Sequence, residues 1–199
     1  MVFNDELDKE IPEGWEVLPL KKLTHYSKER INIKELNLEN YISTENMLPE
    51  RKGITAATNL PNSKTVTKFT VGDILISNIR PYLKKIWKAN FAGGCSNDII
   101  CFKLNGRINP TFLYYTLEQD IFFDYVISGS KGTKMPRGDK NWIMKYLIAI
   151  PLNDDLLNRF ASKAKILSQE ILIKRSENFK MEKIESIVLS KMATIEESI

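Results

Sequence analysis

The chain has 199 residues, of which 43% are hydrophobic and 27% are charged, and its formal net charge is +4. This composition is typical of a folded globular protein and excludes extensive disorder, and no stretch of the sequence is apolar for long enough to span a membrane. Residues 1–15 are acidic and contain no apolar run, so we expect no secretory signal and a cytoplasmic location.

The basic charge belongs to the middle of the chain. Residues 64–145 carry 13 Lys and Arg against 6 Asp and Glu, whereas residues 1–63 carry 8 against 11 and residues 146–199 carry 8 against 8. A local excess of this size, beside acidic and neutral flanks, indicates a polyanionic partner more than a general solubility device.

Several segments of the chain are predicted to be strands. The segment 11–23 opens with a Pro and Gly turn signal and continues with apolar residues, which predicts an entry strand or a short docking segment. Residues 27–65 lack clean periodicity and are expected to form long loops with short strands. β-branched residues then become dense in 65–77, around a Gly-Asp turn, and 98–104 and 146–151 are predicted to be buried strands.

One helix is predicted over residues 109–126. Asn109 can cap this helix and Pro110 suits its first position. Apolar residues recur in it at four-residue spacing: Leu113, Leu117 and Ile121. The helix is expected to end before Gly129, so that the segment 129–140 lies at the rim of an α+β domain.

A much longer helix is predicted from Asp154 to about Met192, where the chain contains neither Gly nor Pro. At 1.5 Å per residue such a helix would be roughly 58 Å long. Its apolar seam has a coiled-coil-like spacing that Lys174 and Asn178 interrupt. We expect this seam to pair with another helix, from a second copy or another subunit. Its members are Phe160, Ala164, Leu167, Ile171, Met181, Ile184 and Val188.

No catalytic constellation is recognisable in the sequence. The phosphate-binding motif G-x-x-x-x-G-K-[ST] and the dinucleotide motif G-x-G-x-x-G are absent. Cys95 and Cys101, with the single histidine His25 far away in sequence, cannot assemble a usual zinc site, and we expect both thiols to be reduced and partly buried. Residues 50–52 hold the acid and lysine of a nuclease-type pair, but they are interpreted as a solvated loop. The chain is therefore predicted to be non-catalytic and to use no cofactor or metal.

The segment 77–98 is the first candidate for binding a polyanion, because its cations alternate with aromatic residues. Such interleaving suits phosphate contacts together with packing against sugars or bases. Arg80 precedes a proline, which favours an extended backbone. The alternative interpretation is an edge strand that lysines protect from aggregation. The predicted DNA-binding residues of this segment are Ser77, Asn78, Arg80, Tyr82, Lys84, Lys85 and Lys88.

The second candidate is the segment 129–140, GSKGTKMPRGDK, which combines glycines, hydroxyl groups and cations. These groups bind phosphate oxygens without reading bases. In the alternative interpretation, Met135 and Pro136 hold the loop against the core and its charges are merely solvated. The predicted DNA contacts of this segment are Lys131, Thr133, Lys134, Arg137 and Lys140.

Five pieces of the sequence, in this order, resemble one target-recognition half of the specificity subunit of type I restriction-modification systems. They are IPEGWEVLPL, VGDILISNIRPYLKKIW, GGCSNDIICFK, GTKMPRGDKNWIMKYLIAIP and the long helix that follows. The resemblance implies an α+β recognition domain at 1–153, with a twisted mixed sheet and flanking helices, and a dimerisation or spacer helix at 154–199. It also implies a non-catalytic subunit that binds double-stranded DNA, on which methyltransferase subunits dock and which restriction subunits can join. Base reading is expected from loops within 31–66 and from 78–88.

The sequence departs from the family in one respect. A typical member has two recognition domains and two helices in one chain, whereas this sequence has one of each. The chain is then either a half-subunit that forms a homodimer on a palindromic bipartite site, or a fragment of a longer subunit. Two other function classes remain open: a protein-interaction adaptor that acts through the long helix, and a nuclease with a degenerate site.

Overall fold

The computed structural model describes the backbone of residues 1–196, with the side chains of these residues except at 172, 175 and 193–196. The last three residues of the predicted segment 154–199 lie outside the described residues. The chain divides into two compact units, Met1–Asn158 and Arg159–Ile199.

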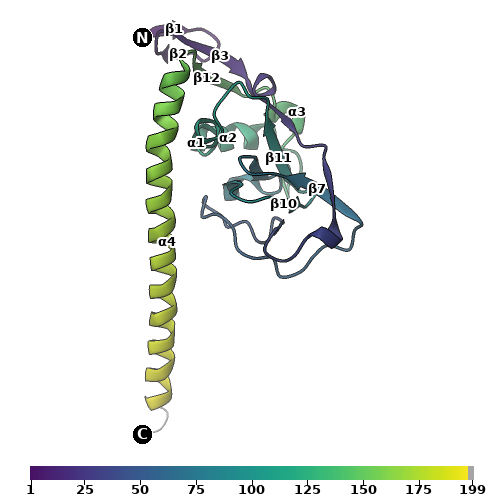
Figure 1. Ribbon diagram of the computed structural model, residues 1–199, viewed down its shortest axis with the longest axis vertical. Helices are drawn as coiled ribbons and strands as arrows, with labels where there is room; N and C mark the ends of the chain where they lie inside the picture. Colours follow the sequence, from purple (N-terminus) through teal and green to yellow (C-terminus); the bar gives the residue numbers. More distant parts are fainter. Residues whose placement is uncertain (197–199) are drawn as a thin grey trace. The chain divides into compact units, whose positions relative to one another are not determined.

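An antiparallel sheet of four strands lies at the centre of the first unit (Figure 1). Its strand order is β4 (Thr24–Tyr26), β11 (Ile99–Leu104), β8 (Ile74–Ser77) and β9 (Ile86–Lys88). The apolar run of β8 is buried on both faces of the sheet, because successive side chains of a strand point to opposite sides. Ile74 and Ile76 join the hydrophobic cluster on one face, and Leu75 joins the cluster on the other.

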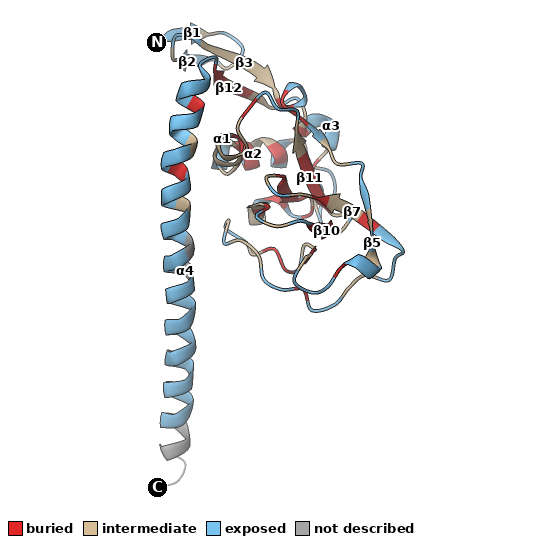
Figure 2. Cartoon of the chain, in the orientation of Figure 1, coloured by how far each residue is buried: buried red, intermediate tan, exposed pale blue. Residues whose placement is uncertain are grey.

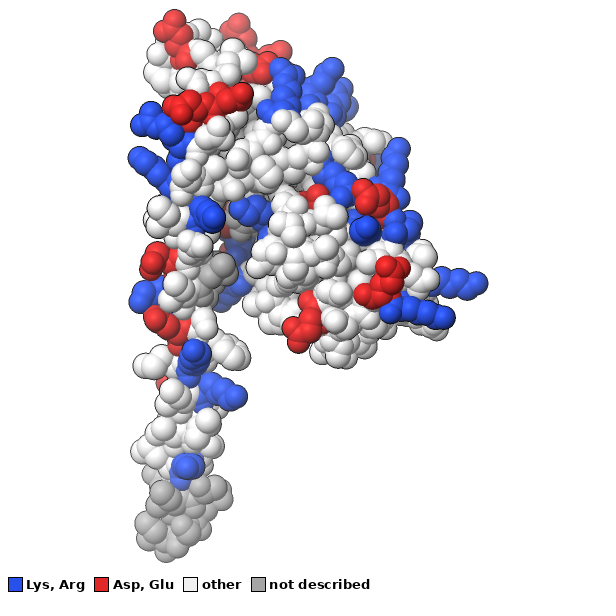
Figure 3. Space-filling model, viewed as in Figure 1, with Lys and Arg blue, Asp and Glu red and all other residues white. Residues whose placement is uncertain are grey.

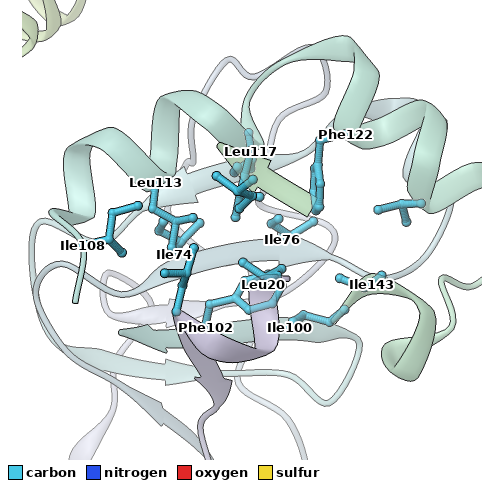
Figure 4. Close-up of a cluster of buried hydrophobic side chains, with 14 of the residues drawn as sticks. Leu20, Ile74, Ile76, Ile100, Phe102, Ile108, Leu113, Leu117, Phe122 and Ile143 are labelled. Carbon is cyan, nitrogen blue, oxygen red and sulfur yellow. The ribbon is translucent and has the colours of Figure 1, made fainter. Parts of the chain in front are cut away.

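The larger hydrophobic core lies between this sheet and a layer of helices (Figure 4). The layer comprises α1 (Pro110–Leu117), α2 (Asp120–Ser128), α3 (Lys140–Ile143) and the short 3-10 helix η1 (Leu20–Lys22). Phe102 of β11, Leu113 of α1, Phe122 of α2 and Leu20 of η1 meet there and are completely buried. Burial of each such side chain contributes about 1.5–3 kcal/mol to stability.

The prediction of a single helix over residues 109–126 is wrong, because the chain forms two helices there. The predicted cap is present, since Asn109 Oδ1 accepts a hydrogen bond from the Thr111 N–H at 2.8 Å. However, α1 ends at Leu117, Gln119 has an extended backbone (φ −67°, ψ 150°), and α2 begins at Asp120. The extended residue interrupts the helical register, so Ile121 is 57% exposed and does not continue the buried row of Leu113 and Leu117.

A second sheet of four strands packs against the first. Its order is β5 (Arg30–Asn32), β7 (Thr65–Phe69), β10 (Gly93–Cys95) and β6 (Tyr41–Ile42), with β6 parallel to β10. Glycine is required in β10, because a Cβ at Gly93 would lie 2.0 Å from the carbonyl oxygen of Asn40. Phe69, Cys95 and Cys101 belong to the buried cluster between the sheets. Both cysteines are thus free and fully buried, which goes beyond the predicted partial burial.

The remaining strands form two small antiparallel sheets. β3 (Trp15–Pro19) pairs with β12 (Leu147–Pro151), and β1 (Val2–Asn4) pairs with β2 (Lys9–Ile11). Two further 3-10 helices, η2 (Ile33–Glu35) and η3 (Pro81–Leu83), lie in the connections. The predicted α+β class is therefore confirmed, although the strands form four small sheets instead of one twisted mixed sheet.

The long helix is confirmed as α4 (Asp154–Glu196), a single element of 43 residues. Figure 2 shows its described residues as mostly exposed, whereas buried residues gather on the strands and helices of the first unit. Ala164, one of the seven predicted seam residues, is 5% exposed. The other six are between 38% and 67% exposed: Phe160, Leu167, Ile171, Met181, Ile184 and Val188.

Candidate nucleic-acid interface

The two basic segments singled out in the sequence, 77–88 and 129–140, lie side by side in the fold. The backbone N–H of Arg80 donates to the Pro136 carbonyl oxygen at 2.8 Å, and the N–H of Gly138 donates to the Asn78 carbonyl oxygen at 3.1 Å. Ile79 and Arg137 form a β-bridge between these bonds. These contacts are made by backbone atoms, so they do not consume the side-chain cations of the two segments.

The segment 129–140 is a closed loop. Lys131 and Arg137 exchange two backbone hydrogen bonds of 2.9 Å, and Gly132 has a left-handed backbone (φ 94°) inside the closure. Met135 is 48% exposed and does not hold the loop against the core, whereas Pro136, the other residue of the alternative interpretation, is half-buried. The exposed residues of the loop include all five predicted DNA contacts: Lys131, Thr133, Lys134, Arg137 and Lys140.

Two of the loop cations have acidic partners at the surface. Lys131 Nζ lies 2.8 Å from Asp139 Oδ2, and an Arg137 guanidinium nitrogen lies 3.0 Å from Asp98 Oδ1. The hydrogen bond from Lys131, together with backbone N–H donors, lowers the pKa of Asp139. Both cations are exposed, so their pairs contribute little to stability and can be exchanged for phosphate oxygens.

The segment 77–88 places its predicted residues in two different environments. Arg80 and Tyr82 are exposed, and Arg80 has a left-handed backbone (φ 51°) where the following proline had favoured an extended one. Ser77 is buried, with its hydroxyl donating to the Ile79 carbonyl oxygen at 3.0 Å. Asn78 is half-buried, and its Oδ1 has no hydrogen-bond partner within the described part of the chain.

The three lysines of this segment all have intramolecular partners. Lys84 Nζ pairs with Asp120 at 2.7 Å, Lys85 Nζ donates to the Thr44 carbonyl oxygen at 2.6 Å, and Lys88 Nζ donates to Thr111 Oγ1 at 2.9 Å. Desolvation lowers the pKa of both Lys85 and Lys88. Lys85 precedes the edge strand β9 and Lys88 ends it. Their positions agree with the alternative interpretation of this segment as an edge strand that lysines protect from aggregation.

The aromatic residues of 77–98 also divide between surface and core. Trp87 and Phe91 pack against Phe69, with ring centroids 5.7 and 5.9 Å from it, and are partly buried against the cluster between the sheets. The aromatic residues that alternate with cations around β9 therefore serve mainly to pack this edge of the sheet against the core. Tyr82, which is 47% exposed, is the aromatic residue of the segment that is open to a ligand.

A third segment is attached to this surface, and it lies within 31–66, where base reading is predicted, although none of its residues was among the predicted DNA contacts. The backbone N–H groups of Glu50 and Arg51 donate to the carbonyl oxygens of Leu83 and Lys84 at 2.9 and 3.1 Å. Arg51 Nε donates to the Glu118 carbonyl oxygen at 2.5 Å, and its guanidinium also pairs with Asp120. The hydrogen bonds from Lys84 and Arg51 lower the pKa of Asp120.

The interpretation of residues 50–52 as a solvated loop is accordingly wrong for Arg51, whose side chain is only 20% exposed. Glu50, Arg51, Arg80 and Lys84 all have left-handed backbones. Such conformations are unfavourable for residues other than glycine and cluster at functional sites. No local sequence signal distinguishes these four residues from ordinary charged loop residues.

The polar loops on either side of this segment are also ordered internally. Asn46 is buried, with its Nδ2 donating to the carbonyl oxygens of Tyr41 and Thr55 and its Oδ1 accepting from the Ser43 N–H. Around Asn46 lies a small hollow, also lined by Glu45, Thr58 and Asn59. These polar side chains lie within 31–66, where base reading is predicted.

The described residues contain no cluster of three or more His, Cys, Asp or Glu arranged to hold a metal ion. His25 is exposed on β4. Among the described helices, none combines the length and apolar character needed to cross a membrane.

No family model matches the chain. Over 70 residues, which are 35% of this chain and 15% of the relative, it is 34% identical to the type I restriction enzyme EcoDI specificity subunit of Escherichia coli. Its fold is similar to that of the HsdS subunit from Thermoanaerobacter tengcongensis, with a TM-score of 0.63 and 20% identity over 82% of this chain and 44% of that one.

Two other solved structures have the same fold. One comes from work on complex assembly and conformational transition of the type I restriction-modification system, with a TM-score of 0.61 and 19% identity over 89% of this chain and 47% of that chain. The other is the type I S subunit from M. genitalium, with a TM-score of 0.56 and 14% identity over 81% of this chain and 41% of that chain. The chain thus spans less than half the length of these structures. Sequence and fold together confirm the predicted resemblance: the chain is related to the specificity subunits of type I restriction-modification systems and corresponds to about half of such a subunit.

Proposed function

We propose that this chain recognises a DNA sequence as one target-recognition half of a type I specificity subunit, and that it is not itself catalytic. The observation that carries this proposal is the junction of the basic segments 77–88 and 129–140 into one surface, on a domain with this fold. Arg80, Lys134 and Lys140 are exposed there, and cations of this kind contact DNA phosphates.

The surface supports a division of roles between its parts. Exposed cations of 129–140, with Arg80, fix the position of the domain on the DNA backbone. Base reading belongs to the polar segment 31–66, since the backbone bonds from Glu50 and Arg51 to η3 hold part of it beside the same surface. Phosphate contacts carry no sequence information, so the two functions require different residue types.

The helix α4 supports a proposal about partners. Its exposed apolar residues include the heptad-spaced series Phe160, Leu167, Met181 and Val188. A second heptad-spaced series, which the sequence prediction did not include, comprises Ile166, Ile173 and Ile187. Neighbouring members of the two rows, such as Ile166 and Leu167, point roughly 100° apart around the helix, which is wider than the narrow apolar seam of a two-stranded coiled coil.

The row that contains Phe160 and Leu167 is proposed to pair with α4 of a second copy in a homodimer. The row that contains Ile166 is proposed to contact a methyltransferase subunit, which a restriction subunit can join. A homodimer has twofold symmetry, so the DNA target is proposed to be a palindromic pair of half-sites. The length of α4 would then set the spacing of these half-sites.

Salt-dependent binding of duplex DNA tests the proposed function. The affinity of the full chain is measured by fluorescence anisotropy over a series of salt concentrations, and the logarithm of the affinity is expected to fall linearly with the logarithm of the salt concentration. In the variant Lys131→Ala/Lys134→Ala/Arg137→Ala the slope should become shallower by about 0.9 for each lost phosphate contact.

A matched control removes three positive charges elsewhere, in the variant Lys9→Ala/Lys165→Ala/Lys183→Ala, and should keep the wild-type slope. Absence of salt-sensitive binding by the wild type would contradict the proposal and favour an adaptor that acts through α4. Metal-dependent cleavage of the duplex by the purified chain would instead favour a nuclease.

A further inference from the structure

A second group of cations lies outside the surface formed by 77–88 and 129–140. Lys21 and Lys22 occupy the last turn of η1, and Lys145 lies two residues after the end of α3. All three side chains belong to exposed residues. Over residues 1–196, none of the three forms an ion pair.

These lysines are brought together by backbone hydrogen bonds between distant parts of the chain. The N–H of Leu20 donates to the Tyr146 carbonyl oxygen at 2.8 Å, and the N–H of Lys21 donates to the Met144 carbonyl oxygen at 3.0 Å. Lys22 is held as well, because its carbonyl oxygen accepts from Asn105 Nδ2 at 2.6 Å. Leu20 itself is completely buried, so η1 is anchored in the core and the lysines project from a fixed frame.

The three positive charges are not neutralised by their surroundings. Figure 3 shows Lys and Arg side chains gathered where β3 ends, while Asp and Glu side chains gather over the neighbouring β1–β2 hairpin. Arg107, by contrast, has an acidic partner, because its guanidinium lies 2.8 Å from a carboxylate oxygen of Glu16. Like charges held close together repel each other, so a group left unpaired suits an anionic partner.

This group is adjacent to the candidate interface. The short helix α3 begins at Lys140, a member of the 129–140 loop, and Lys145 lies just beyond its end. α3 is a single turn of four residues, so only a short stretch of chain separates Lys140 from Lys145. The orientation of α3 is fixed by Asp139, whose Oδ1 accepts from the N–H groups of Asn141 and Trp142 at 2.8 and 3.1 Å. A DNA strand that contacts the loop can therefore continue across α3.

We propose that Lys21, Lys22 and Lys145 form a second contact for the phosphate backbone of duplex DNA, and that α3 connects it to the 129–140 loop. The inference rests on the proposed function and extends the DNA footprint beyond the residues that the sequence predicted. A free amino group on a fixed backbone serves as a point charge for phosphate without reading bases.

Two triple variants of the full chain test this second contact by salt-dependent anisotropy on the same duplex. In Lys21→Ala/Lys22→Ala/Lys145→Ala, loss of three phosphate contacts should make the slope shallower by up to about 2.7. The charge-preserving variant Lys21→Arg/Lys22→Arg/Lys145→Arg should keep the wild-type slope. Equal slopes for wild type and the alanine variant would overturn the second contact. The proposed function would still stand if the variant Lys131→Ala/Lys134→Ala/Arg137→Ala had a shallower slope than wild type.

Lysine acetylation provides an independent readout at individual residues. The full chain is treated with an acetylating reagent with and without the duplex, and modification at each lysine is measured by mass spectrometry. Lys21, Lys22 and Lys145 should be protected by DNA, whereas Lys9 on β2 should not. Unchanged acetylation of the three lysines, together with protection of Lys134, would overturn this contact alone. A wild-type chain that binds no duplex would overturn both proposals.

Discussion

The backbone N–H of Arg80 lies 2.8 Å from the carbonyl oxygen of Pro136, and this hydrogen bond joins two basic segments that are far apart in the sequence. Arg80 reaches this position with a left-handed backbone, immediately before Pro81. The conformation is unfavourable for a residue with a side chain. The surrounding structure therefore stabilises a strained turn that leaves the guanidinium exposed to solvent.

The close packing beneath this junction predicts that Gly138→Ala destabilises the fold. Gly138 is buried, and an added Cβ would lie 2.9 Å from Asn78 Oδ1 and 3.0 Å from Ile143 Cδ1 and from Val126 Cγ1. Overpacking of this kind should lower the free energy of unfolding by about 1–3 kcal/mol. Urea denaturation measures the change. Thr133→Ala, in the exposed part of the same loop, serves as the control and should stay within about 0.5 kcal/mol of wild type.

Arg51 is predicted to hold the polar loop against the helix layer. Its Nε donates to the carbonyl oxygen of Glu118, where the break between α1 and α2 leaves that group without a helical partner. Arg51→Ala should reduce the free energy of unfolding by about 1–3 kcal/mol, because it removes a charged donor to this carbonyl.

Asp120→Asn provides the comparison for Arg51→Ala. The Asp120 side chain is 65% exposed, so loss of its ion pair should have the smaller effect on stability. Chemical denaturation of both variants and of the double variant measures the coupling between the two residues. A larger loss from Asp120→Asn than from Arg51→Ala would contradict the role assigned to the Glu118 carbonyl.

The elements that the sequence predicted correctly are those with apolar patterns. Residues 98–104 and 146–151 form strands, as their apolar runs predicted. The helix α4 is continuous because no Gly or Pro interrupts it. The break at Gln119 was not predictable from periodicity, because the four-residue spacing continues through it. The contact that stabilises the break comes from Arg51, which is distant in sequence.

The candidate interface was predicted by composition but not by geometry. Cations alternating with aromatic residues marked 77–98, and glycines with cations marked 129–140, whereas the bonds between the two segments involve backbone atoms, which every residue carries. For the same reason the attachment of Glu50 and Arg51 to η3 had no signature. The cations Lys85 and Lys88 looked equivalent to Arg80 in sequence, and only the fold shows that their amino groups have intramolecular partners.

The buried thiols predict a defined response to alkaline pH. Desolvation raises the pKa of Cys95 from 9.0 to about 12, and burial raises the pKa of Cys101 as well. Between pH 9.0 and about pH 12 the unfolded chain loses the Cys95 proton, whereas the folded chain keeps it. This difference favours unfolding, so the Cys95 contribution to stability is intact below pH 9 and declines as the pH rises toward 12.

Thiol reactivity measures the same property of Cys95 and Cys101. At neutral pH neither cysteine should react with a thiol reagent in the folded chain, and both should react in denaturant. In denaturation series at increasing pH, Cys95→Ala should lose less stability than wild type above pH 9. Rapid labelling of either thiol under native conditions would contradict the burial of the cluster between the sheets.

The exposed seam of α4 predicts that one added charge will disrupt self-association. Leu167 is 62% exposed and belongs to the heptad-spaced row that is proposed to face a second copy. Leu167→Glu would place a carboxylate against apolar side chains of the partner helix, where desolvation of the charge opposes association. Sedimentation equilibrium should show a dimer for wild type at micromolar concentration and a monomer for this variant.

Lys183→Glu is the matched control for Leu167→Glu, because it introduces the same side chain roughly 160° around the helix from Leu167, on the side opposite the row that is proposed to face a second copy. It should remain a dimer. If wild type is a monomer, the homodimer proposal is wrong, and the apolar rows of α4 must then be covered by other subunits or by the second half of a longer chain. If both variants dissociate, helix stability and not the seam controls association, which circular dichroism of the two variants would reveal as lost helical signal.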